Sequence, residues 1–272
     1  MFRGMTKSVA LTQRGVIAVT GADRVGFLNG LVSNEVANAG PGRAVWAALL
    51  TPQGRYLADF FIFAAGEVLL LEVLAADIEL LLPKLRRFKL RAAVELADVS
   101  DRYKVYAGWD GPIPEAGVAA PDPRSAAAGW RVLSEVALAA NATLEEYAAH
   151  RIGLGLPDGP PDLEADKTLL LEAGFDELGG VAWDKGCYMG QELTARTKYR
   201  GLVKRRLVPV ALAESVLPGA KIMAGAQEVG ELRSVVAGLG LAMLRLDALD
   251  KELMADGVGL TPRLPDWLRV PG

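Results

Sequence analysis

The chain has a single cysteine, Cys187, and a single histidine, His150, among its 272 residues. One thiol cannot form an internal disulfide, and one thiol with one imidazole cannot complete a zinc site or a four-thiolate iron–sulfur cluster. Because no covalent or metal cross-link is available, the fold depends on a packed apolar core. Hydrophobic residues make up 51% of the sequence, as expected for a packed globular protein. The length of 272 residues is enough for two compact domains or for one large domain with an appendage.

Charge and cysteine usage favour a soluble cytoplasmic protein. The formal net charge of -3 and the pI near 5.4 argue against general nucleic-acid affinity. A lone thiol is typical of a reducing compartment. Lys7, Gln13 and Arg14 interrupt the N-terminal segment, so it lacks the apolar centre of a secretory signal. The longest apolar run, 235–244, has about half of the length that spans a bilayer, so we expect no membrane partner.

Hydrophobic periodicity and turn residues predict an α+β fold. Asp23 is suited to cap a helix that starts at the next residue, and Thr143 with Glu146 forms a capping box at the start of another. A third helix is expected from Asp77, with Pro83 kinking or delaying it. The strands expected before the middle of the chain cover 43–50, 55–65, 68–74, 94–99 and 103–109.

Two later stretches differ in composition and patterning from the preceding part of the chain. Residues 110–129 are rich in Pro, Gly and Ala and are interpreted as a loose connection. After Gly201 the chain breaks into short strand-like pieces, which predict a small terminal barrel or sheet of about 70 residues. Those pieces are 205–212, 220–224, 228–236 and 240–246.

The cysteine lies in an unusually polar segment, KGCYMGQE at 185–192, here called the cysteine octet. Lys185 and the later Arg196 bring cations near the thiol, and cations stabilise the thiolate that attacks electrophiles or binds metals. Gly186 and Gly190 remove side chains beside it, as a close approach of a ligand or of another backbone requires. A lone cysteine is more often a small buried residue, and the octet leaves the two interpretations even.

A second candidate is Glu172, which follows three leucines and precedes Gly174, where the chain must turn. A carboxylate at the end of a buried strand suits a flat donor–donor edge such as that of an aminopyrimidinone. Spacing alone favours a capping or salt-bridged glutamate. The basic run at 198–206 could hold a carboxylate tail or a phosphate backbone, or it could be a solvated face.

The octet, with Arg196 and Arg200-Gly201 after it, closely resembles the motif of the bacterial folate-binding YgfZ proteins. These are relatives of mitochondrial factors that mature iron–sulfur proteins. The match extends over most of the chain, as the following segments are similar to family segments: Gly21-Ala22-Asp23, Ser33-Asn34, Pro52-Gln53-Gly54-Arg55 with Asp59, Arg151-Ile152-Gly153, and Gly230-Glu231-Leu232-Arg233-Ser234.

The wider superfamily is that of the glycine-cleavage T-protein, a tetrahydrofolate-dependent aminomethyltransferase. Leu171-Glu172-Ala173-Gly174 matches its pterin-contacting element, which shifts the interpretation of Glu172 toward pterin binding. The resemblance implies a three-lobed T-protein-like α+β fold: a folate-binding region of two interleaved lobes over 1–200, and a C-terminal β-barrel over 201–272. The chain departs from the enzyme in having Ala58-Asp59 instead of two adjacent aspartates, and it looks short for an aminomethyltransferase.

We therefore expect a tetrahydrofolate-binding accessory factor in iron–sulfur protein assembly or repair, acting on client enzymes or cluster carriers and affecting tRNA modification through them. Cys187 would be the reactive or transiently ligating thiol. The residues expected to bind tetrahydrofolate or a derivative are Glu172, Lys185, Tyr188, Gln191, Arg196 and Asn34, with Phe175, Trp183 or Tyr188 as a stacking face. No resident metal is expected.

Two alternatives stay open. The first is a folate-dependent aminomethyl transferase in which Asp59 positions the amine or the one-carbon group; the departures from the T-protein put its turnover in question. The second is an RNA-modification helper that contacts tRNA through the basic run at 198–206. The acidic balance of the chain makes nucleic acid the least favoured partner.

Overall fold

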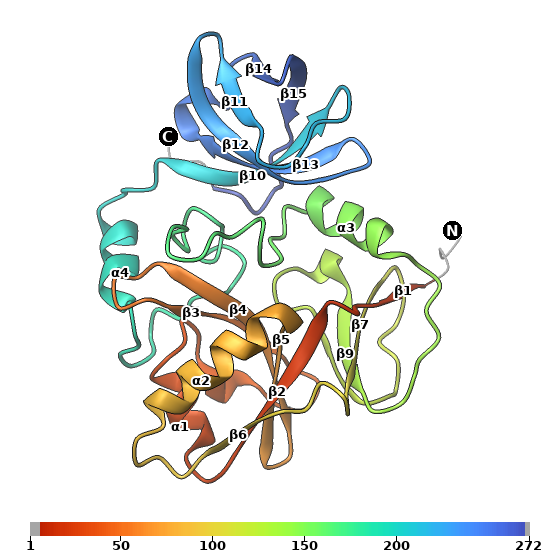
Figure 1. Cartoon of the computed structure of the whole chain (residues 1–272), viewed down its shortest axis with the longest axis vertical. Helices are drawn as coiled ribbons and strands as arrows, with labels where there is room; N and C mark the ends of the chain where they lie inside the picture. Colours follow the sequence, from red (N-terminus) through yellow and green to blue (C-terminus); the bar gives the residue numbers. More distant parts are fainter. Residues whose placement is uncertain (1–5, 270–272) are drawn as a thin grey trace.

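The computed structural model describes residues 6–269, and its strands form three lobes (Figure 1). A five-stranded sheet and a four-stranded sheet lie side by side, and a closed six-stranded barrel sits above them. The predicted α+β fold with a C-terminal barrel is confirmed. Within the described residues no helix is both long and apolar enough to cross a membrane.

The first lobe is an antiparallel sheet in the order β3-β4-β5-β2-β6. Strands β3 and β4, at one side of this sheet, are largely buried on both faces, and alternate residues enter different cores. Trp46 and Phe61 face the core shared with the rest of the protein, whereas Ala47 and Phe60 face the core under the helices. Its elements are β2 (Arg14–Thr20), α1 (Arg24–Asn29), η1 (Val36–Asn38), β3 (Val45–Leu50), β4 (Tyr56–Ala65), β5 (Val68–Leu74), η2 (Ala75–Asp77), α2 (Ile78–Phe88) and β6 (Glu95–Asp98).

The two predicted helices of this lobe form, with different details at their starts. The Asp23 side chain does not cap α1; its carboxylate accepts a hydrogen bond from the Ala93 N–H at 2.7 Å. Helix α2 begins at Ile78 and continues past Pro83 to Phe88. Pro83 is tolerated because it lies on the exposed side, where water can solvate the Glu79 carbonyl that loses its partner.

The second lobe is a four-stranded sheet in the order β1-β7-β9-β8. The expectation of a loose connection over 110–129 was wrong, because β8 lies there and pairs antiparallel with β9. An edge strand tolerates this composition: Pro121 is the last residue of β8, and the pairing continues through the Asp122 N–H, which donates to the Gly129 carbonyl oxygen at 2.9 Å. The elements are β1 (Lys7–Ala10), β7 (Lys104–Trp109), β8 (Val118–Pro121), η3 (Ala126–Ala128), β9 (Trp130–Ser134) and α3 (Leu144–Gly153). The predicted capping box of Thr143 and Glu146 starts α3.

The third lobe is a closed barrel in the order β10-β13-β12-β11-β14-β15, entered from helix α4 (Gln191–Tyr199). Closure removes free sheet edges, so these short strands leave no unpaired edge in the barrel wall. Its elements are β10 (Arg205–Leu212), β11 (Lys221–Ala224), β12 (Gln227–Val236), β13 (Leu239–Arg245), η4 (Leu246–Ala248), β14 (Leu253–Ala255) and β15 (Val258–Pro262).

A buried ionic network joins the first two lobes. Glu72 on β5 accepts hydrogen bonds from Arg14 on β2, at 2.9 Å, and from Arg131 on β9. Asp122, just after β8, binds Arg131 at 3.1 Å and Arg124 at 2.8 Å. All five side chains are buried. Burial alone would raise the pKa of Asp122, but Arg124 and Arg131 lower that pKa well below its usual value.

The network continues to the barrel. Arg14 also meets Asp158, at 3.3 Å, in the loop that follows α3. Arg151 on α3 binds Asp162 of the same loop at 2.6 Å, and Asp162 accepts a hydrogen bond from Ser234 on β12. Arg151 also lies 3.9 Å from Asp158, so the paired charges run continuously from the first two lobes to α3 and its following loop, and the Ser234 hydroxyl links them to the barrel.

Glu72→Gln should destabilise the protein by about 3–5 kcal/mol, because it leaves Arg14 and Arg131 buried without their shared counter-charge. Urea unfolding followed by circular dichroism measures the change. The matched control is Glu135→Gln, whose exposed ion pair with Arg102 is screened by water and should leave the midpoint unchanged. Equal midpoints for the two variants would show that the network does not hold the lobes together.

Candidate functional site

The cysteine octet forms an exposed loop that is fixed at both ends, and Cys187 is exposed on it. Gly190, with a left-handed φ of +81°, packs against the β3–β4 turn. A Cβ there would lie 2.6 Å from the Thr51 carbonyl oxygen and 2.9 Å from the Gly54 Cα. The predicted close approach at Gly190 is therefore to the protein's own backbone. A Cβ at Gly186 would meet nothing within 4 Å.

Lys185 fixes the other end of the loop. Its ammonium group donates to the carbonyl oxygens of Asn29 at 2.8 Å, Val32 at 2.8 Å and Asn34 at 2.7 Å. Burial lowers the pKa of Lys185 to about 8. All three ammonium protons have acceptors in the first lobe, so this lysine acts as an anchor for the loop and not as a free cation beside the thiol.

The other residues in and just after the octet that were expected to line a folate pocket make contacts within the protein instead. The Gln191 side-chain oxygen accepts from the Tyr188 N–H at 3.3 Å, and Arg196 pairs with Glu192 at 2.5 Å on the exposed face of α4. Tyr188 is buried, and its ring centroid lies 5.2 Å from the Lys185 ammonium nitrogen. Burial raises the pKa of Tyr188 to about 12.

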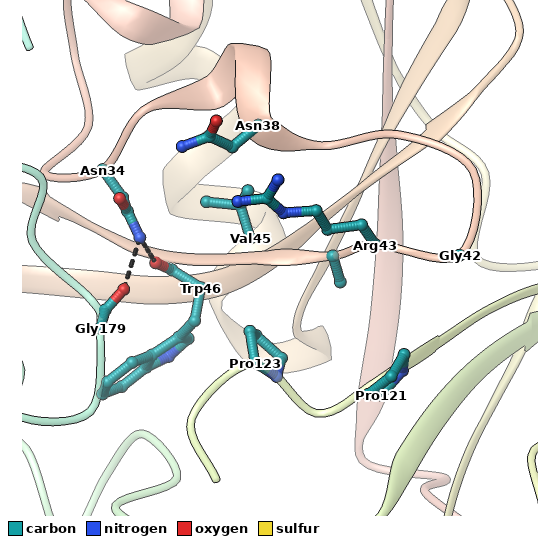
Figure 2. Close-up of a pocket in the computed structure, with 10 residues that line it drawn as sticks. Asn34, Asn38, Gly42, Arg43, Val45, Trp46, Pro121, Pro123 and Gly179 are labelled. Atoms are coloured by element: carbon teal, nitrogen blue, oxygen red, sulfur yellow. Dashed lines mark hydrogen bonds between the residues drawn. The ribbon is translucent and has the colours of Figure 1, made fainter. Parts of the chain in front are cut away.

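Asn34, whose carbonyl oxygen accepts from Lys185, lines a cavity of about 320 Å³ between the first two lobes, and no octet residue is in that lining (Figure 2). Its amide nitrogen donates to the carbonyl oxygens of Trp46 and Gly179, both at 2.7 Å. Arg43 and Asn38 line the same cavity from the loop before β3. Of the predicted ligand-binding residues, Asn34 alone is in this lining.

Glu172 lies in a run of turns at 169–179 and not at a strand end, as expected. Its buried carboxylate meets the half-exposed Arg205 guanidinium at 3.3 and 3.4 Å. Both residues line a cavity of about 700 Å³ between the segment that follows α4 and the end of β13 in the barrel. Its other lining residues are Leu202, Val203, Lys204, Arg245, Leu246 and Asp247. Cys187 is not in this lining, so the structure does not bring the thiol and the carboxylate into one cavity.

Asp59 is buried beneath the first cavity. One carboxylate oxygen accepts from the Trp46 indole N–H at 2.8 Å and the other from the Tyr56 hydroxyl at 2.8 Å. The Trp46 ring stacks on Phe175 with centroids 3.9 Å apart. Trp183 is covered by Lys198, whose ammonium lies 3.8 Å from the ring centroid. None of the three aromatic side chains predicted to stack on a pterin lines the Glu172 cavity.

Sequence reasoning missed the residues that surround Glu172 from the barrel, above all Arg245 and Asp247 at the end of β13. They are separated from Glu172 by more than seventy positions, and no local motif marks them. The basic run at 198–206 did identify Arg205 as a candidate for binding an anionic group. Within residues 6–269 no group of three or more His, Cys, Asp or Glu side chains is arranged to hold a metal ion.

Lys185→Met should loosen the octet loop, because three buried carbonyl oxygens lose their donor at a cost of about 1–3 kcal/mol. Hydrogen exchange should accelerate at the Ala182 and Met189 amides, which bond the loop to Ser33 and Gly30. Lys251→Met, at an exposed lysine of the barrel, is the control. Unchanged exchange at both amides would contradict the anchoring role.

Comparisons with known proteins match the C-terminal barrel and the whole fold separately. The family model of the CAF17 C-terminal β-barrel domain matches residues 204–270. In structure, the chain resembles the glycine cleavage system aminomethyltransferase T from Bartonella henselae, with a TM-score of 0.75, 14% identity, and 97% of this chain and 87% of that chain covered. This likeness confirms the predicted T-protein-like fold.

Three curated relatives are iron–sulfur cluster assembly factors named IBA57 or IBA57 homolog. The human protein is 33% identical and the mouse protein 32%, each over 94% of this chain and 84% of its own length. The protein from Mycosarcoma maydis is 38% identical over 75% of this chain, which spans 57% of that relative's length.

The predicted cytoplasmic location is contradicted, because these relatives are named as mitochondrial proteins. That prediction depended on cysteine usage and charge, and a lone thiol indicates a reducing environment without saying which compartment provides it. With a third of its residues identical to the human protein over nearly its whole length, the chain belongs to the IBA57 family of iron–sulfur cluster assembly factors.

Proposed function

We propose that this protein assists the assembly or repair of iron–sulfur proteins and that Cys187 is its reactive or transiently ligating thiol. The observation that carries the proposal is the placement of the chain's one thiol: exposed on a loop that Lys185 and Gly190 fix to the first lobe. A rigidly presented thiol can supply one ligand to a cluster whose other ligands come from a client enzyme or a carrier. One thiolate cannot house a cluster alone.

The surroundings of the thiol suit such a partner. The exposed side of α4 begins beside the octet and carries Arg196 and Arg200, followed by Lys204. Among the described residues, Arg200 and Lys204 make no ion pair. A cluster held by several thiolates is an anionic group, and the unpaired Arg200, at the end of the helix that begins in the octet, would attract it.

Cys187→Ser should abolish formation of a cluster-bridged complex with a carrier protein that holds a [2Fe–2S] cluster. The complex is followed by visible circular dichroism and size-exclusion chromatography. Because Cys187 is exposed, the free energy of unfolding should change by less than about 0.5 kcal/mol. Ser215→Ala, at an exposed position of the barrel, is the control. Full client activation by Cys187→Ser would overturn the role of the thiol.

We further propose that a reduced folate binds in the Glu172 cavity, apart from Cys187. The donor set fits this ligand: a buried carboxylate for the donor edge of the pterin, and Lys204, Arg205 and Arg245 for an anionic tail. The volume of about 700 Å³ falls in the range of small-molecule sites. The long contacts between Glu172 and Arg205 leave a carboxylate that a ligand can engage.

Glu172→Gln should weaken tetrahydrofolate binding by about tenfold to a hundredfold, since a charge-assisted hydrogen bond to a buried carboxylate contributes about 1.5–3 kcal/mol. Isothermal titration calorimetry measures the affinity. Glu214→Gln, an exposed carboxylate of the barrel, should bind like the parent protein, and so should Cys187→Ser. Binding that is unaffected by Glu172→Gln would exclude this cavity.

No observation within the described chain favours the two alternatives. Aminomethyl transfer would require a free Asp59 carboxylate, and both of its oxygens already accept hydrogen bonds. RNA binding would use the cations along 198–206 together, but three of the five are engaged within the protein: Lys198 with Asp176, Arg205 with Glu172 and Arg206 with Glu177. In this run only Arg200 and Lys204 form no ion pair among the described residues. The proposed likeness to the folate-binding YgfZ proteins depends on the octet sequence. The cluster and folate experiments above test the two properties that this likeness implies.

A further inference from the structure

Helix α2 and the five residues after it carry a basic and apolar surface that neither proposed function uses. Between Ile78 and Ala93 the chain has one carboxylate, Glu79, and the cations Lys84, Arg86, Arg87, Lys89 and Arg91. The whole chain has a net charge of -3, so the positive charge is concentrated here against the overall balance. Such local segregation indicates a partner of negative charge.

Three of these cations are free to meet a partner. Arg86 donates to the Leu96 carbonyl oxygen at 2.9 Å, and Lys89 pairs with Glu95 at 2.7 Å. Lys84, Arg87 and Arg91 are exposed and form no ion pair within residues 6–269. Helical spacing places Arg87 on the side opposite the buried Ile78, Leu81 and Leu85, and Lys84 on the flank between the two sides. Neither charge is on the side of α2 that packs on the first-lobe sheet, which α2 covers in Figure 1.

Large apolar side chains are interleaved with these cations. Leu80 is 76% exposed, Phe88 37% and Leu90 89%. Leu90 also has a left-handed φ of +45°, a conformation that is unfavourable for a leucine. Exposure and backbone strain both cost free energy in water, so a second phase that takes up these side chains would offset the cost.

We infer that this surface, formed by Leu80, Lys84, Arg87, Phe88, Leu90 and Arg91, docks on an anionic lipid bilayer. Basic side chains would pair with lipid headgroups while the leucines and the phenylalanine enter the boundary of the acyl chains. A nucleic acid would satisfy the cations but would leave Leu80 and Leu90 in water. The binding is peripheral and reversible, and it requires no membrane-spanning helix. It is independent of the cluster and folate proposals.

Flotation of the full chain with vesicles tests the inference. We expect binding to vesicles of equal parts phosphatidylcholine and phosphatidylglycerol, weakening as salt is added, and none to phosphatidylcholine alone. The combined variant Lys84→Glu/Arg87→Glu/Arg91→Glu should lower the partition coefficient by about a hundredfold. The matched control, Lys251→Glu/Arg263→Glu/Arg269→Glu, makes the same change of net charge at exposed barrel positions and should retain most of the binding. Equal losses in both variants would show that vesicle binding depends only on the net charge of the protein, and this would overturn the inference.

Two further variants test insertion. Leu80→Ser/Leu90→Asn should lower binding by about tenfold at every salt concentration, because it removes apolar area. Asparagine accepts the left-handed backbone at position 90, so folding is preserved. In Phe88→Trp the new indole should show a blue-shifted emission on adding anionic vesicles. Emission that stays unshifted, or binding to single-stranded RNA without binding to vesicles, would overturn the inference.

Discussion

The buried ionic network is the constraint on which the arrangement of the lobes depends. Four arginines and four carboxylates alternate through the centre of the molecule: Arg14, Arg124, Arg131 and Arg151 with Glu72, Asp122, Asp158 and Asp162. A buried charge is tolerated only when its counter-charge is in place, so the first two lobes cannot separate without leaving a buried ion unpaired. The barrel is joined to the network by the hydrogen bond from Ser234 to Asp162. The Arg131 guanidinium also lies 3.7 Å from the Phe61 ring centroid, which ties the network to the hydrophobic core.

This filling of the centre determines where chemistry can take place. Trp46 stacks on Phe175 and bonds to Asp59, and Arg124 lies 5.5 Å from the Trp46 ring centroid. These side chains are thus in contact with one another. The accessible polar groups lie farther out, at Asn34, at the Glu172 cavity and on the octet loop. The proposed thiol chemistry and the proposed folate binding are consequently separate.

Local patterns predicted three helices and many of the strands, but not β1, β2, β9, β14, β15 or α4. Apolar runs between turn residues mark β3 and β4, and the pair Thr143 and Glu146 marks the start of α3. β8 escaped prediction because proline and glycine dominate its surroundings, and only its pairing with β9 makes it a strand. The octet was recognised as special from its density of polar residues. The role of Lys185 was not, since its acceptors at Asn29, Val32 and Asn34 lie about 150 positions away.

The sequence alone determined that this chain has one thiol, no cross-link and a fold of alternating sheets and helices closed by a terminal barrel. The tertiary structure decided that the thiol is exposed, that Lys185 anchors its loop, and that Glu172 faces Arg205 and the barrel instead of Cys187. The physical reason is the range of the interactions. Periodicity and capping act within a few residues, whereas ion pairs and cavity walls join segments whose proximity depends on how the three lobes pack.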